Sequence, residues 1–203
     1  MVLAGQFLER PALIDADGLT LEGLYHRGTR RPALLVCPPP GEGGGMDAPA
    51  VAELAWAAAR AGHPSLRFQH RGTGASQGVP DPARAGDDGE AAYRHLSATA
   101  GPRIAVAALG AGASTALALA RAHPEVDRVV LVAPDRIPDL SGAAVRVLVL
   151  VPEISPAVAA EPIAAAVGPA GTVEIVARAD PLFRAVLPEI GRRAVAWIAA
   201  RVG

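Results

Sequence analysis

The residues best placed to carry chemistry follow an apolar run at positions 104–109, where the chain reads Gly-Ala-Gly-Ala-Ser and then turns helical in pattern. A strand, a turn of small residues and a helix in this order are typical of a nucleophile elbow, in which the nucleophile stands between small residues two positions before and after it. Ala108 and Gly112 take the small positions. The nucleophile position is then Gly110, which has no side chain that could attack a substrate.

The same turn also matches part of a dinucleotide fingerprint of the GxGxxG type. Gly110 and Gly112 would let a pyrophosphate approach the N-terminus of the helix. Thr115 stands where the third glycine belongs, and the segment lies in the middle of the chain. We rank the elbow first, tight helix-on-strand packing without a ligand second, and the dinucleotide site third. Ser114 lies inside the helix, so we expect a solvated or back-bonded serine and not a nucleophile.

Composition restricts the function classes. The chain has 203 residues, which predicts a single domain over 1–203, and a formal net charge of −1 with no block of like charges. This pattern indicates neither a nucleic-acid-binding surface nor a basic membrane-binding helix. The one cysteine, Cys37, excludes an internal disulfide and a Cys-based zinc site. No signal peptide or metal-ligand spacing is recognisable, so we expect a cytoplasmic protein without cofactor or metal.

Short apolar runs, bounded by Gly, Pro or charged residues, predict strands that are buried on both faces of a parallel sheet. They lie at 33–37, 65–68, 104–109, 129–132, 145–151 and 173–176. Residues 6–27 alternate around Asp17-Gly18 and predict an antiparallel hairpin.

Segments with helical periodicity separate these runs, at 48–61, 84–96, 113–122, 157–167 and 182–201. Asp47 is the expected N-cap of the first helix, and Ser155-Pro156 the expected start of the fourth. The alternation predicts an α/β three-layer sandwich with a mostly parallel sheet of about eight strands. The connection over 132–145 is too short to hold a lid domain.

The segment from residue 34 to residue 78, LLVCPPPGEGGGMDAPAVAELAWAAARAGHPSLRFQHRGTGASQG, carries further motifs. They are Gly44, Gly45 and Met46, then Leu66-Arg67-Phe68, then Arg71-Gly72, Gly74, Ser76 and Gly78, with Asp88 on the following helix. In these motifs the chain resembles the short, cap-less α/β-hydrolase proteins of the serine-hydrolase superfamily, well over residues 33–125 and weakly elsewhere. The resemblance implies a hydrolase-type fold. We expect Arg71 to pair with Asp88 and brace its loop.

The chain departs from that family at the positions that do chemistry. The family's first loop histidine is Cys37 here, and the oxyanion-hole position is Pro39, which has no N–H to donate. The nucleophile position is Gly110. Glu153 is the one carboxylate in the region of the acid, and Pro181 stands at the position of the catalytic histidine.

The order of residues along the chain also indicates that the catalytic residues of the family are missing. In this fold the catalytic triad runs Ser, then Asp or Glu, then His. The five histidines include none beyond His123. Among the other polar candidates, we interpret Cys37 as a small buried hydrophobe, His70 beside Arg71 as a solvated loop residue, and Asp180 as a loop cap.

The sequence therefore predicts a catalytically inactive hydrolase homologue, a pseudoenzyme that serves as a binding, scaffolding or assembly module. Its predicted ligand cleft is lined by Cys37, Pro39, Gly44, Gly45, Met46, Arg71, Gly110, Ala111 and Asp180. A small acyl or lipid-like ligand or a protein partner would occupy the cleft, and a homo-oligomer is compatible with the sequence. Two alternatives remain: an active esterase or thioesterase that uses Cys37, and a nucleotide-binding protein that uses the Gly110 loop.

Overall fold

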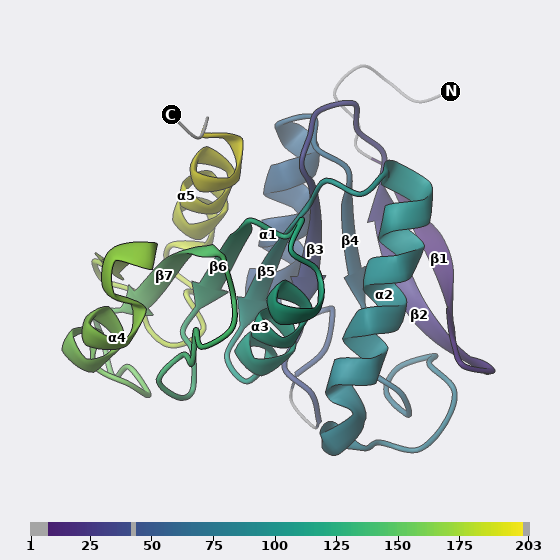
Figure 1. The fold of residues 1–203 in the computed structure, drawn as a ribbon, viewed down its shortest axis with the longest axis horizontal. Helices are drawn as coiled ribbons and strands as arrows, with labels where there is room; N and C mark the ends of the chain where they lie inside the picture. The colour runs from purple at the N-terminus through teal and green to yellow at the C-terminus, as the bar shows by residue number, and fades with distance from the viewer. Residues whose placement is uncertain (1–7, 42–43, 201–203) are drawn as a thin grey trace.

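The computed structural model describes residues 8–41 and 44–200, which form one eight-stranded sheet with helices on both faces (Figure 1). The strands are β1 (Glu9–Ala16), β2 (Leu19–His26), β3 (Ala33–Cys37), β4 (Ser65–Phe68), β5 (Ile104–Leu109), β6 (Arg128–Val132), β7 (Arg146–Pro152) and β8 (Gly171–Val176). Their spatial order is β1-β2-β4-β3-β5-β6-β7-β8. The β1–β2 hairpin joins the sheet antiparallel to β4, and the strands from β3 to β8 are parallel.

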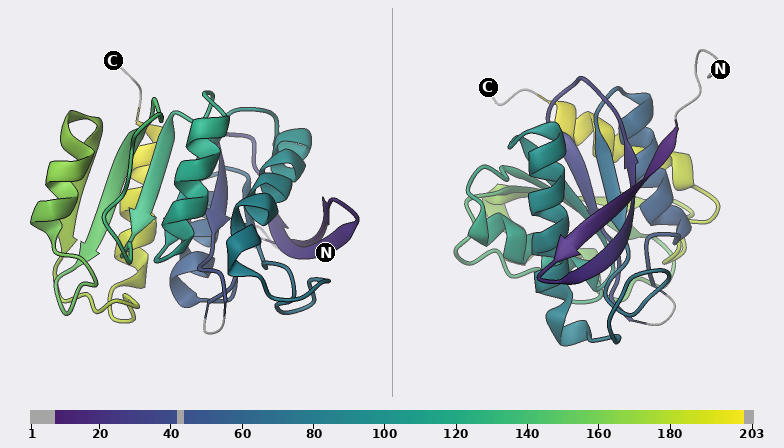
Figure 2. Two further views of the ribbon diagram at one scale, coloured as in Figure 1. Left: turned by 60° about the horizontal axis from the view of Figure 1, so that its bottom comes forward. Right: turned by 90° about the vertical axis from the view of Figure 1, so that its right-hand side faces the viewer.

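Five helices cover the two faces of this sheet: α1 (Pro49–Arg60), α2 (Ala85–Ala100), α3 (Gly112–Ala122), α4 (Ala160–Val167) and α5 (Leu187–Ala199). Helices α1 and α5 pack together on one face, and α2, α3 and α4 cover the other (Figure 2). The predicted three-layer sandwich, the hairpin and the absence of a lid domain are confirmed for the described residues. None of the helices described has both the length and the apolar character needed to cross a bilayer.

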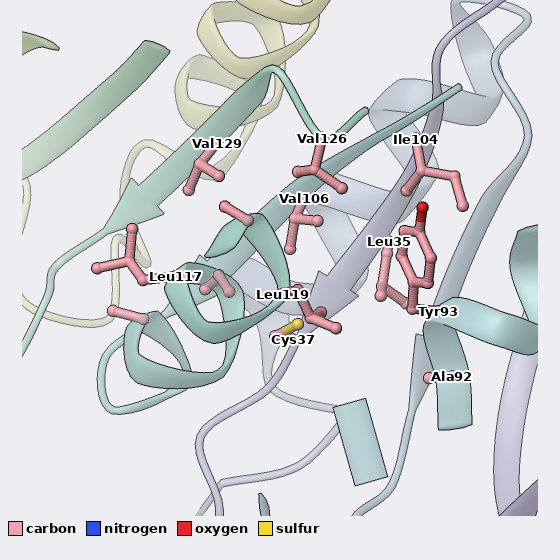
Figure 3. Close-up of a cluster of buried hydrophobic side chains, with 14 of the residues drawn as sticks. Leu35, Cys37, Ala92, Tyr93, Ile104, Val106, Leu117, Leu119, Val126 and Val129 are labelled. Atoms are coloured by element: carbon pink, nitrogen blue, oxygen red, sulfur yellow. The ribbon is translucent and has the colours of Figure 1, made fainter. Parts of the chain in front are cut away.

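The core is built from small aliphatic side chains, because only 3% of the residues are aromatic. Strands β3, β5 and β6 are buried along their whole length, as expected for the centre of a parallel sheet. On the α2–α3 face, Leu35, Val106 and Val129 from these strands meet Leu117 and Leu119 of α3 (Figure 3). The central strands are thus held firmly where they deliver their loops to the carboxyl edge of the sheet.

The predicted helix starts are wrong in three places. Asp47 does not cap α1: Ala48 is the N-cap residue, and the Asp47 carboxylate accepts from Arg67 Nη1 at 3.0 Å instead. Helix α4 begins at Ala160 and not after Ser155, because Ser155 has a φ of +49° and therefore cannot adopt the extended N-cap conformation. Helix α5 begins at Leu187, five residues later than predicted.

Candidate functional site

The turn between β5 and α3 has the left-handed backbone expected at a strand-to-helix elbow. Gly110 has a φ of +53°, and its N–H donates to Val132 O at 2.9 Å. This conformation favours glycine but does not demand it on steric grounds, because a Cβ on Gly110 would lie 3.9 Å from Pro39 Cγ and 4.0 Å from Ala133 O. The turn therefore has room for a side chain at the position where the sequence provides none.

Gly112 is held by a different constraint. A Cβ there would lie 2.5 Å from Cys37 O and 2.8 Å from Pro38 O, both of which are backbone atoms. The first turn of α3 approaches the loop after β3 so closely that only glycine fits. The two glycines of the turn therefore do different work: one permits a strained conformation, and the other permits close packing.

The loop after β3 begins with a buried thiol and three prolines. Cys37 is fully buried, and burial raises the pKa of its thiol far above the ordinary value. Its sulfur lies among the hydrophobic side chains of the α2–α3 face (Figure 3). Pro38, Pro39 and Pro40 have no backbone N–H. Residues 37–40 therefore supply neither a thiolate nucleophile nor an N–H donor for an oxyanion hole.

The last part of that loop is fixed by Gln69, the residue that follows β4. Met46 is buried, and its N–H donates to Gln69 Oε1 at 3.1 Å. Gly45 has a φ of +112°, and a Cβ on it would lie 2.5 Å from the same oxygen. A Cβ on Gly44 would lie 2.5 Å from Pro39 O, so both ends of the loop are packed together.

A buried ion pair braces the loop after β4. Asp88 on α2 is fully buried, and its carboxylate accepts from Arg71 Nε at 2.8 Å and from the Arg71 backbone N–H at 3.0 Å. His70 is buried beside this pair and is not solvated as the sequence suggested: Nδ1 is 3.3 Å from Asp88 Oδ2, and Nε2 is 3.2 Å from Pro38 O. Burial alone would raise the pKa of Asp88, but the hydrogen bonds from His70 and Arg71 outweigh it and hold that pKa below its ordinary value.

Glu153, at the position expected for the catalytic acid, and Asp180, next to the position expected for the histidine, both bind loop backbone. Glu153 Oε2 accepts from the Arg178 N–H at 2.7 Å and so ties the loop after β7 to the loop after β8. Asp180 Oδ1 accepts from the N–H groups of Leu182 at 3.1 Å and Arg184 at 3.2 Å, which agrees with the loop cap expected from the sequence. Pro181, at the position expected for the histidine, is exposed between Asp180 and Leu182. Both carboxylates hold loop backbone.

Backbone strain gathers at the carboxyl edge. Five described residues other than glycine have a positive φ, and one of them, Asp17, lies in the β1–β2 turn. The other four, Ala133, Ser155, Arg178 and Phe183, lie in the loops that follow β6, β7 and β8. Such strain costs of order 1–3 kcal/mol for each residue, and it concentrates at binding and catalytic sites. The positive-φ residues are therefore concentrated at the edge that holds the candidate site.

The nine residues of the predicted cleft are only partly brought together. Pro39, Gly44 and Gly110 are neighbours, and Cys37, Gly45, Met46 and Arg71 are buried beneath the loops. Asp180 is half-buried on the loop after β8, and its hydrogen bonds within the described residues go to Leu182 and Arg184 of the same loop. The cleft as a whole stays a prediction.

A crevice next to the elbow escaped the sequence analysis. It has a volume of about 210 Å³ and lies between α3 and the loop after β6. Its walls include Ser114 and Leu117 on one side and Arg136, Ile137 and Pro138 on the other. Ser114 is exposed on α3, as expected, and Ile137 is 49% exposed. The sequence signal that could have indicated this crevice is Ile137, an apolar residue in a loop rich in Pro and Asp. Over the described part of the chain, no group of three His, Cys, Asp or Glu side chains could hold a metal ion.

Comparison with known proteins identifies the fold. No family model matches the sequence, and no curated protein sequence matches it. Among solved structures, an α/β serine hydrolase homologue from Coxiella burnetii is similar with a TM-score of 0.77 and 24% identity, over 98% of this chain and 100% of that one. A lidless α/β serine hydrolase from Xanthomonas campestris is similar with a TM-score of 0.77 and 20% identity, over 100% of both chains.

A dienelactone hydrolase from Anabaena variabilis is also similar, with a TM-score of 0.73 and 17% identity, over 95% of this chain and 97% of that one. These matches span nearly whole chains, with TM-scores of 0.73 to 0.77. At identities below 25% they establish architecture and not activity. The chain therefore has the α/β-hydrolase fold in its lidless form.

Proposed function

We propose that this protein is a non-catalytic α/β-hydrolase homologue that uses the carboxyl edge of its sheet for binding. The observation that carries the proposal is Gly110, which occupies the strained turn where the fold presents its nucleophile and has no side chain. The turn has room for a Cβ, so crowding does not account for the glycine.

The surroundings of Gly110 support the same conclusion. A hydrolase of this fold also needs a second oxyanion donor from the loop after β3 and a histidine after the last strand. The first is replaced by a run of prolines, and the sequence has no histidine after His123. Loss of all these parts leaves no route to an acyl-enzyme by the usual mechanism.

The binding role rests on what the edge retains. The four strained residues in the loops after β6, β7 and β8 are kept at a cost in stability, which a bound ligand would explain. The crevice beside α3 offers the Leu117 and Ile137 side chains and the Ser114 hydroxyl. At about 210 Å³ it is smaller than the roughly 300 Å³ typical of drug-sized sites. A short acyl group with a polar head fits this chemistry.

Two other functions have less support. A hydrolase that uses Cys37 would need an accessible thiolate, but the thiol is buried and its pKa is raised. A nucleotide site at the Gly110 loop would need open space beside Gly112. The side of Gly112 where a Cβ would lie is filled by the carbonyl oxygens of Cys37 and Pro38, which would repel a pyrophosphate.

The catalytic half of the proposal is tested with a panel of p-nitrophenyl esters of increasing chain length. The natural protein is expected to show no turnover above the buffer rate. A Gly110→Ser/Pro181→His double variant restores a nucleophile and a base at the family positions, and slight activity is expected from it. Gly110→Ala is the matched control, because it adds the same Cβ without a hydroxyl.

Turnover by the natural protein would contradict the proposal. If Gly110→Ala abolished that turnover, the elbow itself would be implicated in catalysis. If alkylation of Cys37 abolished it, the thiol alternative would replace the pseudoenzyme.

The binding half is tested by NMR titration with short fatty acids. We expect saturable shifts in the amides that surround the crevice. Ser114→Leu fills the crevice and should abolish them. Ala118→Leu adds the same side chain to an exposed position of α3 outside the crevice and should leave them unchanged. Equal responses of the two variants would place the ligand elsewhere.

A further inference from the structure

Arginines stand at the starts of neighbouring parallel strands, at the amino edge of the sheet and therefore opposite the candidate site. Arg103 precedes β5, Arg128 begins β6 and Arg146 begins β7, and these three strands are adjacent. Arg128 and Arg146 are direct partners in the register of β6 and β7. Like charges on neighbouring strands repel each other. The amino edge thus gathers positive charge, although the whole chain has a net charge of −1.

The arginines at this edge lack the ion pairs that arginines make elsewhere in the molecule. Several arginines pair with carboxylates, as Arg71 does with Asp88 at 2.7 Å. Arg103 and Arg128 form no ion pair within residues 8–41 and 44–200. Arg31, which lies just before β3 on the other side of β5, donates only to the carbonyl oxygen of its neighbour in the chain. The positive charge of this edge is therefore left without a matching anion in the part of the chain that the structure describes.

Arg128 is the buried member of this group, with 5% of the residue exposed. Its one hydrogen bond within the described residues goes from Nη1 to Trp197 O, in the last turn of α5. A guanidinium has five N–H donors, so this bond uses only part of it. A buried cation costs several kcal/mol unless it is paired with an anion. An anion that reached the remaining donors of Arg128 would offset that cost.

A cavity of about 480 Å³ lies beside Arg128 and is large enough for such an anion. This volume is within the range of roughly 300–1,000 Å³ that is typical of small-molecule sites. The charged side chains in its walls are those of Arg31, Arg103, Arg128, Glu125 and Asp127. Glu125 is already engaged, because its Oε1 accepts from Tyr93 Oη at 2.7 Å. The walls therefore combine a buried guanidinium with two exposed ones at the rim, and they carry a net positive charge.

We propose that this cavity binds a small molecule through a phosphate group. The planar fork of a guanidinium matches the oxygens of a phosphate, with two parallel N–H···O bonds. Arg128 binds the anion from the inner wall, and Arg31 and Arg103 bind it from the rim. The carboxylates of Glu125 and Asp127 in the same walls disfavour an extended polyanion, so a compact phosphate ester or diphosphate is the ligand class that we assign.

The proposal is tested by titration of the full chain with inorganic pyrophosphate at constant ionic strength, followed through the backbone amide signals in NMR spectra. Saturable shifts are expected in the residues that line the cavity, such as Ile104 and Ala199. The signals of the Gly110 turn, at the opposite edge of the sheet, should not change. Acetate is the control ligand and should bind far more weakly, because a carboxylate carries one charge and two oxygens.

Arg103→Gln removes an exposed guanidinium from the rim and should raise the Kd for pyrophosphate about tenfold, as expected for a hydrogen bond between charged groups. Arg184→Gln is the matched control. It changes an exposed arginine in the loop after β8, at the other edge of the sheet, and should leave the Kd unchanged. Arg128→Lys keeps the buried charge without the planar fork and should also weaken binding.

Three outcomes would overturn the proposal. They are the absence of saturable binding of pyrophosphate to the natural protein, equal affinity for acetate, and equal effects of Arg103→Gln and Arg184→Gln on the Kd. Because Arg103 and Arg184 are both exposed, neither substitution removes a packed side chain from the core. The result does not depend on whether the chain hydrolyses esters.

Discussion

Gly110 and Gly112 stand two residues apart in one turn and respond to substitution for different reasons. At Gly110 the constraint is a φ of +53°, and the space around a Cβ is open to 3.9 Å. At Gly112 the backbone oxygens of Cys37 and Pro38 occupy the place of the Cβ. The first constraint acts on the local backbone conformation, and the second acts on the contact between α3 and the loop after β3.

We therefore expect Gly112→Ala to lower the free energy of unfolding by about 3 kcal/mol, the upper part of the range for overpacking a tight contact. Gly110→Ala should cost about 1 kcal/mol, because only a left-handed conformation is strained. Urea unfolding of both variants measures the difference. A larger loss at Gly110 would show that the turn is packed more tightly than the structure has it.

At the scale of the elements, the sheet was more predictable than the helix ends. Strands β3, β5 and β6 are uninterrupted apolar runs, because both of their faces are buried, and the sequence pattern located each to within a residue. The start of a helix depends on single hydrogen bonds, and the pattern of apolar residues does not predict which partners form them. Asp47 looked like a cap, but its carboxylate is taken by Arg67, which comes from a strand 20 positions away.

The candidate site was predictable to a similar extent. The glycines, the prolines and the missing histidine could be recognised because each is a property of one residue or its place in the order. The burial of His70 against Asp88 and Pro38 could not, because it depends on three elements meeting in space. The crevice beside α3 could not be predicted for the same reason, because it depends on the path of the loop after β6.

We expect the contact of Asp88 on α2 with Arg71 in the loop after β4 to be sensitive to acid. The pKa of Asp88 in the folded protein lies below its ordinary value, so the carboxylate contributes stability above the unfolded pKa of about 3.9. This contribution is lost as the pH falls through the lower, folded pKa. The natural protein should therefore lose unfolding free energy steadily below about pH 4.

Asp88→Asn removes the charge and leaves Arg71 buried without a partner, so a loss of about 3–5 kcal/mol at neutral pH is expected. As the pH falls below 4 and through the lowered pKa of Asp88, the variant and the natural protein should converge, because the natural protein then loses its carboxylate as well. Denaturant melts between neutral and acidic pH measure both curves. Parallel curves would show that Asp88 does not cause the acid sensitivity.

At the scale of the whole molecule, the sheet order, the two helical layers and the lack of a lid place the chain among lidless α/β hydrolases by architecture. Architecture does not carry activity with it. The central strands are buried and the turn after β5 has a left-handed glycine, and we propose that the residues that would act on a substrate are replaced. The α/β-hydrolase fold is therefore present, and we propose that the chemistry usually associated with it is lost.

The most direct measurement of that claim is reaction with a fluorophosphonate probe, followed by intact mass spectrometry, because it needs no knowledge of the substrate. The probe forms a covalent bond with an activated nucleophile wherever one exists. We expect no mass increase in the native protein, with Gly110→Ser/Pro181→His as the variant that can gain an adduct. One adduct on each native chain would contradict it, and mapping the modified residue would identify the nucleophile.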